Sequence, residues 1–111
     1  MALPPYRIEI SPTGYRSLKA IKGRKLLREI AKTIDGLNQS PDRKGKLLRA
    51  PLEGVYSLRA ARDRFRVLYR VDPRRKLVSV LLVAARAPGA EEDVYALAKK
   101  LLATFLKKES G

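Results

Sequence analysis

The chain has 111 residues and carries 25 Lys or Arg against 11 Asp or Glu, so its formal net charge is +14. It contains no Cys and no His, which excludes disulfides, thiolate metal sites and acid–base catalysis by imidazole. A charge this positive favours a polyanionic partner, namely nucleic acid, an anionic membrane surface or an acidic protein, although a solvated basic surface is an equally simple explanation. The length predicts one domain spanning residues 1–111.

One strand and two helices are predicted in the N-terminal third of the chain. Tyr6–Ile10 alternates between apolar and polar residues, as a half-buried strand does. Ser11-Pro12 is typical of an N-cap followed by proline in the first turn, so a helix is expected over Thr13–Lys22. A second helix is expected over Arg24–Leu37, since its apolar residues recur at helical spacing. They form one core-facing stripe: Leu26, Leu27, Ile30, Ile34 and Leu37.

Three strands are predicted in the middle of the chain, after a basic connection over Pro41–Gly54. Tyr56–Ala61 and Arg64–Tyr69 both alternate and are separated by two residues, which is typical of a hairpin. Asp72–Arg75 predicts a turn. Leu77–Ala85 is apolar at nearly every position, as in a central strand covered on both faces.

A last helix is predicted from Glu91 to about Lys108, after a loop at Ala87–Ala90. Acidic residues in its first turn and lysines toward its end suit the helix dipole. Adjacent carboxylates do not converge on a helix, so Glu91, Glu92 and Asp93 are not expected to bind a metal. The order of strand, two helices, three antiparallel strands and a helix indicates an α+β fold, in which helices pack against one side of a small twisted antiparallel sheet.

The predicted hairpin places two arginines opposite each other. If Arg62 and Asp63 alone form the loop, the apolar residues of both strands share one face and Arg59 faces Arg66 on the other. Like charges in facing positions destabilise a sheet, by about 1 kcal/mol even at the dielectric constant of water. Folding alone therefore gives no reason for the pair, whereas an anion held between the two side chains does.

Three segments carry a specific pattern in this order and at these spacings. The first runs from Lys46-Leu47-Leu48 through Gly54-Val55-Tyr56-Ser57-Leu58-Arg59, the second is Arg64–Val71 and the third is Val83–Arg86. With them, nearly the whole chain resembles the RelE/ParE superfamily of bacterial and archaeal toxins from type II toxin–antitoxin pairs. The resemblance to the RelE branch implies an endoribonuclease that cleaves messenger RNA in the ribosomal A site. That reaction needs no metal or other cofactor, and the ribose 2′-OH attacks to form a 2′,3′-cyclic phosphate.

The resemblance implies four catalytic residues: Arg59, Arg66, Arg86 and Tyr95. Arg59 and Arg66 would clamp the charge of the transition state, because guanidinium makes planar, bidentate contacts with phosphate. Tyr95 is the candidate base, since nearby arginines favour a phenolate, and Arg86 is the candidate acid or a second clamp. The alternatives are an aromatic anchor for the last helix at Tyr95 and two solvated strand arginines at Arg59 and Arg66.

The chain departs from the family pattern at two places. Ser57 stands where many RelE toxins carry Lys or Arg, so one phosphate-directed charge is missing. The loop between Arg86 and Tyr95 is also longer than in the best-known bacterial member.

Further basic residues predict an RNA- or ribosome-binding surface: Arg43, Lys44, Lys46, Arg49, Arg62 and Arg64. The expected partners are messenger RNA on the ribosome, ribosomal RNA and an acidic cognate antitoxin. No membrane partner is expected, because Leu77–Ala85, the longest apolar run, is too short to cross a bilayer. The N-terminus lacks the regions of a signal peptide, so we expect a cytoplasmic protein. Two alternatives stay open: a non-enzymatic ParE-like inhibitor of DNA gyrase, and a basic nucleic-acid-binding domain without catalysis.

Overall fold

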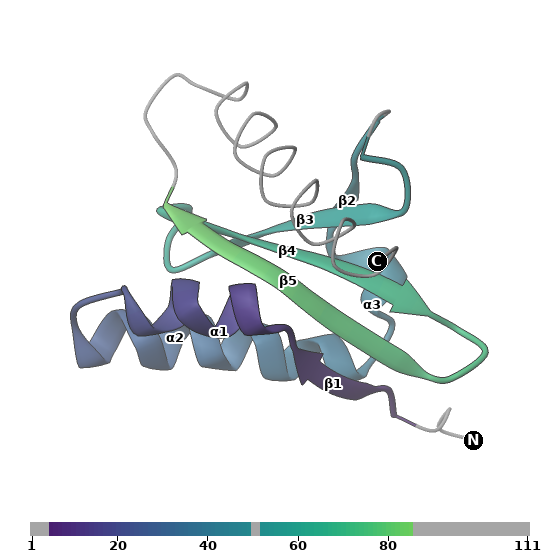
Figure 1. Ribbon diagram of the computed structural model, residues 1–111, viewed down its shortest axis with the longest axis horizontal. Helices are drawn as coiled ribbons and strands as arrows, with labels where there is room; N and C mark the ends of the chain where they lie inside the picture. The colour runs from purple at the N-terminus through teal and green to yellow at the C-terminus, as the bar shows by residue number, and fades with distance from the viewer. Residues whose placement is uncertain (1–4, 50–51, 86–111) are drawn as a thin grey trace.

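The computed structural model describes residues 5–49 and 52–85, which form a five-stranded sheet with helices against one face (Figure 1). In chain order the described elements are β1 (Arg7–Ile10), α1 (Pro12–Lys19), α2 (Arg24–Asp35), the 3-10 turn η1 (Gly36–Asn38), α3 (Pro41–Lys44), β2 (Lys46–Leu47), β3 (Val55–Ala60), β4 (Phe65–Asp72) and β5 (Leu77–Ala85).

The sheet has the strand order β1-β5-β4-β3-β2. Strands β2 to β5 are antiparallel to their neighbours, whereas β1 runs parallel to β5. The predicted α+β class and the two N-terminal helices on the sheet are confirmed. The expectation of a wholly antiparallel sheet is wrong at β1, because the long chain between β1 and β5 allows the parallel direction that a short hairpin forbids.

The two predicted N-terminal helices form, with different ends from those expected. The Ser11 hydroxyl accepts a hydrogen bond of 3.0 Å from the Gly14 N–H, so the N-cap prediction is confirmed. Helix α1 ends at Lys19, three residues early, and α2 ends at Asp35 with its last turn tightened into η1. The predicted connection over Pro41–Gly54 contains two short elements, α3 and β2, that the sequence did not predict.

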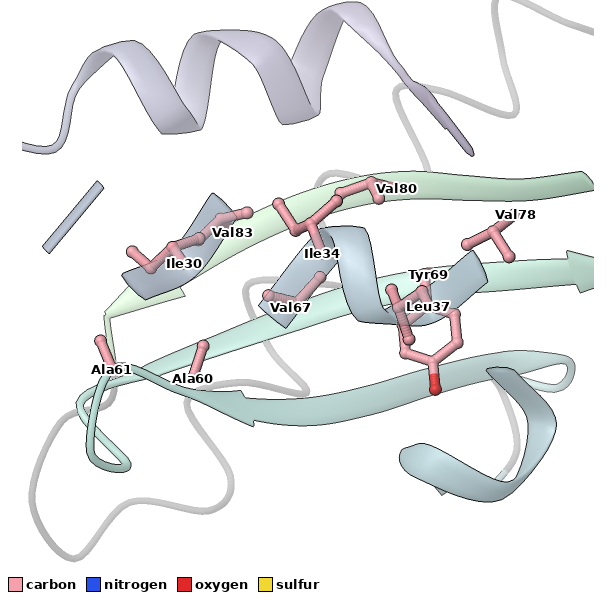
Figure 2. Close-up of a cluster of buried hydrophobic side chains, with 10 residues drawn as sticks. All are labelled: Ile30, Ile34, Leu37, Ala60, Ala61, Val67, Tyr69, Val78, Val80 and Val83. Atoms are coloured by element: carbon pink, nitrogen blue, oxygen red, sulfur yellow. The ribbon is translucent and has the colours of Figure 1, made fainter. Parts of the chain in front are cut away.

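Apolar side chains cover both faces of the central strands, as the sequence of β5 predicted. The first cluster lies between the sheet and the helices (Figure 2) and consists of Ile30, Ile34, Leu37, Ala60, Ala61, Val67, Tyr69, Val78, Val80 and Val83. It includes three residues of the predicted stripe of α2 and η1. The second cluster lies on the opposite face and consists of Leu48, Leu52, Val55, Leu68, Leu81, Leu82 and Ala84.

Beyond the end of β1, helix α1 and its N-cap supply hydrogen-bond partners for the edge of β5. A bulge leaves Leu81 without a partner on β4, because Leu68 pairs with Leu82 and Tyr69 with Val80. The Ser11 hydroxyl donates to the Leu81 carbonyl oxygen at 3.2 Å, and farther along the same edge the Val83 N–H donates to the Ser17 hydroxyl at 2.9 Å. The side chains of Ser11, the N-cap of α1, and of Ser17 within the helix therefore satisfy backbone groups that a strand would otherwise pair.

Gly14 permits this close approach of α1 to β5. A Cβ atom at position 14 would lie 2.8 Å from the Val80 carbonyl oxygen, closer than real Cβ atoms come to other atoms. Glycine is therefore required at this position for packing, although it has a lower helix propensity than most other residues.

Tyr69 fastens the basic segment of α3 and β2 to the sheet. Its ring is fully buried and stacks on that of Tyr56 at a centroid distance of 5.3 Å. The Tyr69 hydroxyl donates to the Pro41 carbonyl oxygen at 2.7 Å. Burial raises the pKa of Tyr69 to about 12, with the backbone N–H of Gly45 opposing that rise. The neutral phenol is thus the form that the fold holds.

The raised pKa of Tyr69 predicts a loss of stability at alkaline pH. The pKa of Tyr69 is about 12 in the folded chain and about 10 in the unfolded chain. The neutral phenol therefore stabilises the folded state, and this contribution is complete below pH 10. That contribution should disappear as the pH rises from about 10 to about 12, at about 1.4 kcal/mol per pKa unit. In Tyr69→Phe the Pro41 carbonyl loses its donor, so we expect a free energy of unfolding about 1–3 kcal/mol lower at neutral pH.

Urea unfolding of both proteins between pH 7 and pH 11.5 measures this effect. The difference in free energy of unfolding between wild type and Tyr69→Phe should narrow above pH 10, because the variant cannot ionise at that position. All other tyrosines and lysines are common to both proteins and cancel in the difference. A difference that stays constant over this range would contradict the assignment.

Candidate functional site

The β3–β4 hairpin has the register that its alternating sequence predicts. Leu58 pairs with Val67 on the helix-facing side, and Arg59 pairs with Arg66 on the other. The Arg64 N–H donates to the Ala61 carbonyl oxygen at 3.1 Å, so Arg62 and Asp63 are the central residues of the turn, as expected.

An unusual backbone closes this turn. Ala61, Arg62 and Asp63 have φ angles of 49°, 55° and 70°. Two-residue hairpin loops favour positive φ at both central residues, but a third such residue, here an alanine, is uncommon. The turn therefore holds a strained conformation that directs the Asp63 side chain back along the hairpin.

Asp63 supplies an anion between the two facing arginines. Its Oδ1 atom lies 2.7 Å from Nη1 of Arg66 and 3.5 Å from Nε of Arg59. The expectation that folding gives no reason for the arginine pair is therefore wrong. The carboxylate comes from the turn of the same hairpin and offsets the repulsion that two facing cations would otherwise suffer.

The two arginines differ in exposure. The Arg66 side chain is 12% exposed, whereas that of Arg59 is 75% exposed. Nη1 of Arg66 also approaches the carbonyl oxygens of Phe65 at 3.3 Å and Asp63 at 3.5 Å. Arg66 is thus a mostly buried, anchored guanidinium, and Arg59 is a solvent-facing one. Together they form a site where a phosphate group could meet two guanidinium donors, one anchored and one exposed.

Lys46 joins the arginines on the same face of the sheet. It pairs with Ser57 across the β2–β3 ladder, and facing residues of an antiparallel pair project to the same side. Ser57 and Arg59 are two positions apart on β3, so they also share a face. The sequence placed Lys46 in a basic connection and could not show this neighbourhood, because it did not predict β2.

The other predicted binding residues form two groups, and all are exposed. Arg43 and Lys44 lie on α3, where the Lys44 ammonium donates to the Gly36 carbonyl oxygen, and Arg49 follows β2. Arg62 and Arg64 belong to the hairpin turn. There they line a hollow of about 160 Å³ together with Lys25, Leu26, Glu29 and Ala61. Lys25 of α2 was missed, since its helix gave no sign of approaching the hairpin.

Arg86 and Tyr95 lie outside the described residues, as do the loop predicted over Ala87–Ala90 and the helix predicted from Glu91. Within residues 5–49 and 52–85, no three carboxylates lie close enough to hold a metal ion. In that same part of the chain, none of the helices has the length and apolar character needed to span a bilayer.

Known proteins share this sequence pattern and architecture, although no family model matches the chain. Toxin RelG of Mycobacterium tuberculosis is 35% identical over 91 residues, which are 82% of this chain and 97% of that protein. Toxin RelE of the same organism is 31% identical over 83 residues, 75% of this chain and 84% of that protein.

Solved structures give the same result. The toxin–antitoxin complex RelBE2 of Mycobacterium tuberculosis contains a chain that is 32% identical, with a TM-score of 0.66 over 74% of this chain and 99% of that one. The chromosomal ParDE toxin–antitoxin system of P. aeruginosa contains a chain with a TM-score of 0.64 over 77% of this chain and 100% of that one. Its identity is 20%, so this second likeness concerns the fold alone.

The different burial of the two arginines predicts different effects on stability. Arg59→Ala should change the free energy of unfolding by less than about 0.5 kcal/mol, because an exposed ion pair contributes little. Arg66→Ala should lower it by about 1–3 kcal/mol, since it removes a short hydrogen bond to a carboxylate from a mostly buried position. Chemical denaturation of both variants measures the two values. Equal values would contradict the distinction between an anchored and a solvent-facing arginine.

Proposed function

Because the chain belongs to the RelE family of toxins from type II toxin–antitoxin pairs, we propose that it is a metal-independent endoribonuclease. It cleaves messenger RNA in the ribosomal A site and so inhibits translation. The observation that supports this proposal best is the guanidinium pair of Arg59 and Arg66, held on one face of the β3–β4 hairpin.

Guanidinium groups suit the proposed reaction. The ribose 2′-oxygen attacks the adjacent phosphorus and gives its proton to a base, while the bond from phosphorus to the 5′-oxygen breaks and that oxygen takes up a proton. The product carries a 2′,3′-cyclic phosphate. The phosphorane between these states carries more negative charge than the substrate, and fixed cations at that point lower the barrier. Arg59 and Arg66 take this role, with Tyr95 proposed as the base and Arg86 as the acid or an additional clamp.

Lys46 replaces the cation that many RelE toxins carry at the position of Ser57. Since Lys46 faces Ser57 across the β2–β3 ladder, its long side chain starts about 5 Å from the serine Cβ. It can thus place an ammonium over the same face as Arg59 and Arg66. The cation is therefore carried by β2 in this chain, in place of the β3 position that Ser57 occupies.

The remaining charge of the chain favours ribosomal RNA and an acidic antitoxin as partners. The net charge of +14 favours binding to a polyanion, and each neutralised phosphate should make the affinity fall by about 0.7 to 0.9 log units per log unit of salt. The relatives whose structures support the family assignment include a toxin in complex with its antitoxin. We propose an acidic antitoxin that covers the face of Arg59 and Arg66.

Primer extension on messenger RNA in a translating extract tests the proposed activity. The purified protein should produce discrete cuts at A-site positions, and Arg59→Ala and Arg66→Ala should each slow cleavage by about 100- to 1,000-fold, as the loss of one transition-state donor does. Intact RNA together with gyrase-dependent DNA breaks would instead identify a ParE-like inhibitor. RNA binding without cuts or breaks would identify a nucleic-acid-binding domain.

The proposed role of Lys46 predicts a rescue across the strands. Lys46→Ala should slow cleavage about tenfold, which corresponds to about 1.4 kcal/mol of transition-state stabilisation. Adding Ser57→Lys to that variant should restore most of the rate, because the new ammonium starts from the facing position. Arg74→Ala, which removes the same charge from the exposed β4–β5 turn, is the matched control and should cleave like wild type. A double variant as slow as Lys46→Ala would contradict the replacement.

A further inference from the structure

Asp63 occupies the centre of the arginine pair, although neither the sequence pattern nor the family resemblance assigned it a role. One carboxylate oxygen of Asp63 contacts both guanidinium groups, at 2.7 Å from Arg66 and 3.5 Å from Arg59. We infer that Asp63 is the positioning residue of this site, which fixes Arg66 in the orientation that receives a phosphate group. The inference rests on the proposed function and deepens it.

The hydrogen bonds that Arg66 makes to the described residues all come from one nitrogen. Nη1 meets the Asp63 carboxylate, the Asp63 carbonyl oxygen and the Phe65 carbonyl oxygen. Within the described residues, Nε and Nη2 of Arg66 make no hydrogen bond. Asp63 therefore holds one corner of the planar group and leaves the edge formed by Nε and Nη2 for a ligand. That edge offers two parallel donors, the geometry in which arginine binds phosphate oxygens best.

The charges are consistent with positioning. Two guanidinium groups and one carboxylate together carry a net charge of +1, so these three groups still attract a phosphate. Without the carboxylate, the facing cations would repel each other. The exposed Arg59 side chain would then move away from Arg66 into the solvent, and Arg66 would lose its charged partner. Asp63 thus draws both donors toward one point before any ligand binds.

The backbone of the turn places the carboxylate. Ala61, Arg62 and Asp63 all have left-handed φ angles, which orders the chain into a conformation that non-glycine residues rarely adopt. Strain of this kind persists where the surrounding structure holds it and is found often at functional sites. Here the paired strands on either side hold the turn, and the result is a carboxylate that points at Arg66.

Two substitutions at Asp63 separate positioning from a general effect on folding. Asp63→Asn keeps an oxygen that accepts a hydrogen bond from Nη1, whereas Asp63→Ala removes it. Single-turnover cleavage on programmed ribosomes should slow about 100-fold in Asp63→Ala, the size expected from a misplaced reacting group. The Asn variant should recover to within about tenfold of wild type. Binding to the ribosome should stay within about threefold in both variants, because the exposed basic surface is unchanged.

Asp72→Ala is the matched control. Asp72 is also a turn aspartate, and its carboxylate accepts from the N–H groups of Arg74 and Arg75. It lies six positions from Arg66 along β4, about 20 Å at the usual rise of a strand. This variant should cleave like wild type even if its melting temperature falls. A melting temperature of Asp63→Ala similar to that of Asp72→Ala then removes stability as an explanation for slow cleavage.

The Nε–H resonance of Arg66 in the free protein gives a readout that does not depend on activity. We expect one resolved signal with slow exchange in wild type and in Asp63→Asn, and an averaged, fast-exchanging signal in Asp63→Ala. If wild type cleaves no RNA, the proposed function fails, and this resonance still decides whether Asp63 positions Arg66. An unchanged resonance in Asp63→Ala would overturn the inference. Faster cleavage and tighter binding in either Asp63 variant would also overturn it, because the carboxylate would then compete with phosphate.

Discussion

The register of the β3–β4 hairpin is the constraint on which the rest of the site depends. Side chains alternate along a strand, so a slip of one residue would turn Arg66 toward the helices and Val67 away from them. Val67 is fully buried in the cluster under α2, and that burial opposes such a slip. The core therefore sets the register, and the register places Arg59 opposite Arg66 on the other face.

Strand β4 connects the core to the basic surface. Val67 and Tyr69 face the helices, while Arg66 faces the opposite side. The Tyr69 hydroxyl reaches the Pro41 carbonyl oxygen and so fixes the start of the segment that leads to Lys46. The arginine pair and the lysine on the neighbouring strand thus share one rigid support, which keeps their separation constant better than flexible loops would.

Local pattern was enough to predict the hairpin, because alternation and a two-residue turn both act over neighbouring residues. The register of that hairpin pointed to Arg59 and Arg66, and the resemblance then implied a catalytic role for them. The rest depends on contacts between distant segments. Strand β2 is two residues long and exists through its pairing with β3, and the bulge at Leu81 accompanies the packing of Ser11 and Ser17 on β5. The reach of Asp63 depends on three positive φ angles that composition does not reveal, since alanine and arginine rarely adopt them.

The facing arginines show how one charge arrangement can serve both folding and the proposed chemistry. A pair of cations without a partner would weaken the sheet and leave both side chains disordered, so binding a phosphate would first have to order them. With Asp63 in place, Arg66 is already ordered in the free protein through three contacts of Nη1. In the proposed reaction, the interaction of the remaining donors with the phosphate can then act on the charge that develops in the transition state, because little reorganisation remains. The carboxylate that offsets the repulsion between the facing arginines in the folded hairpin therefore also orients them toward the phosphate in the proposed reaction.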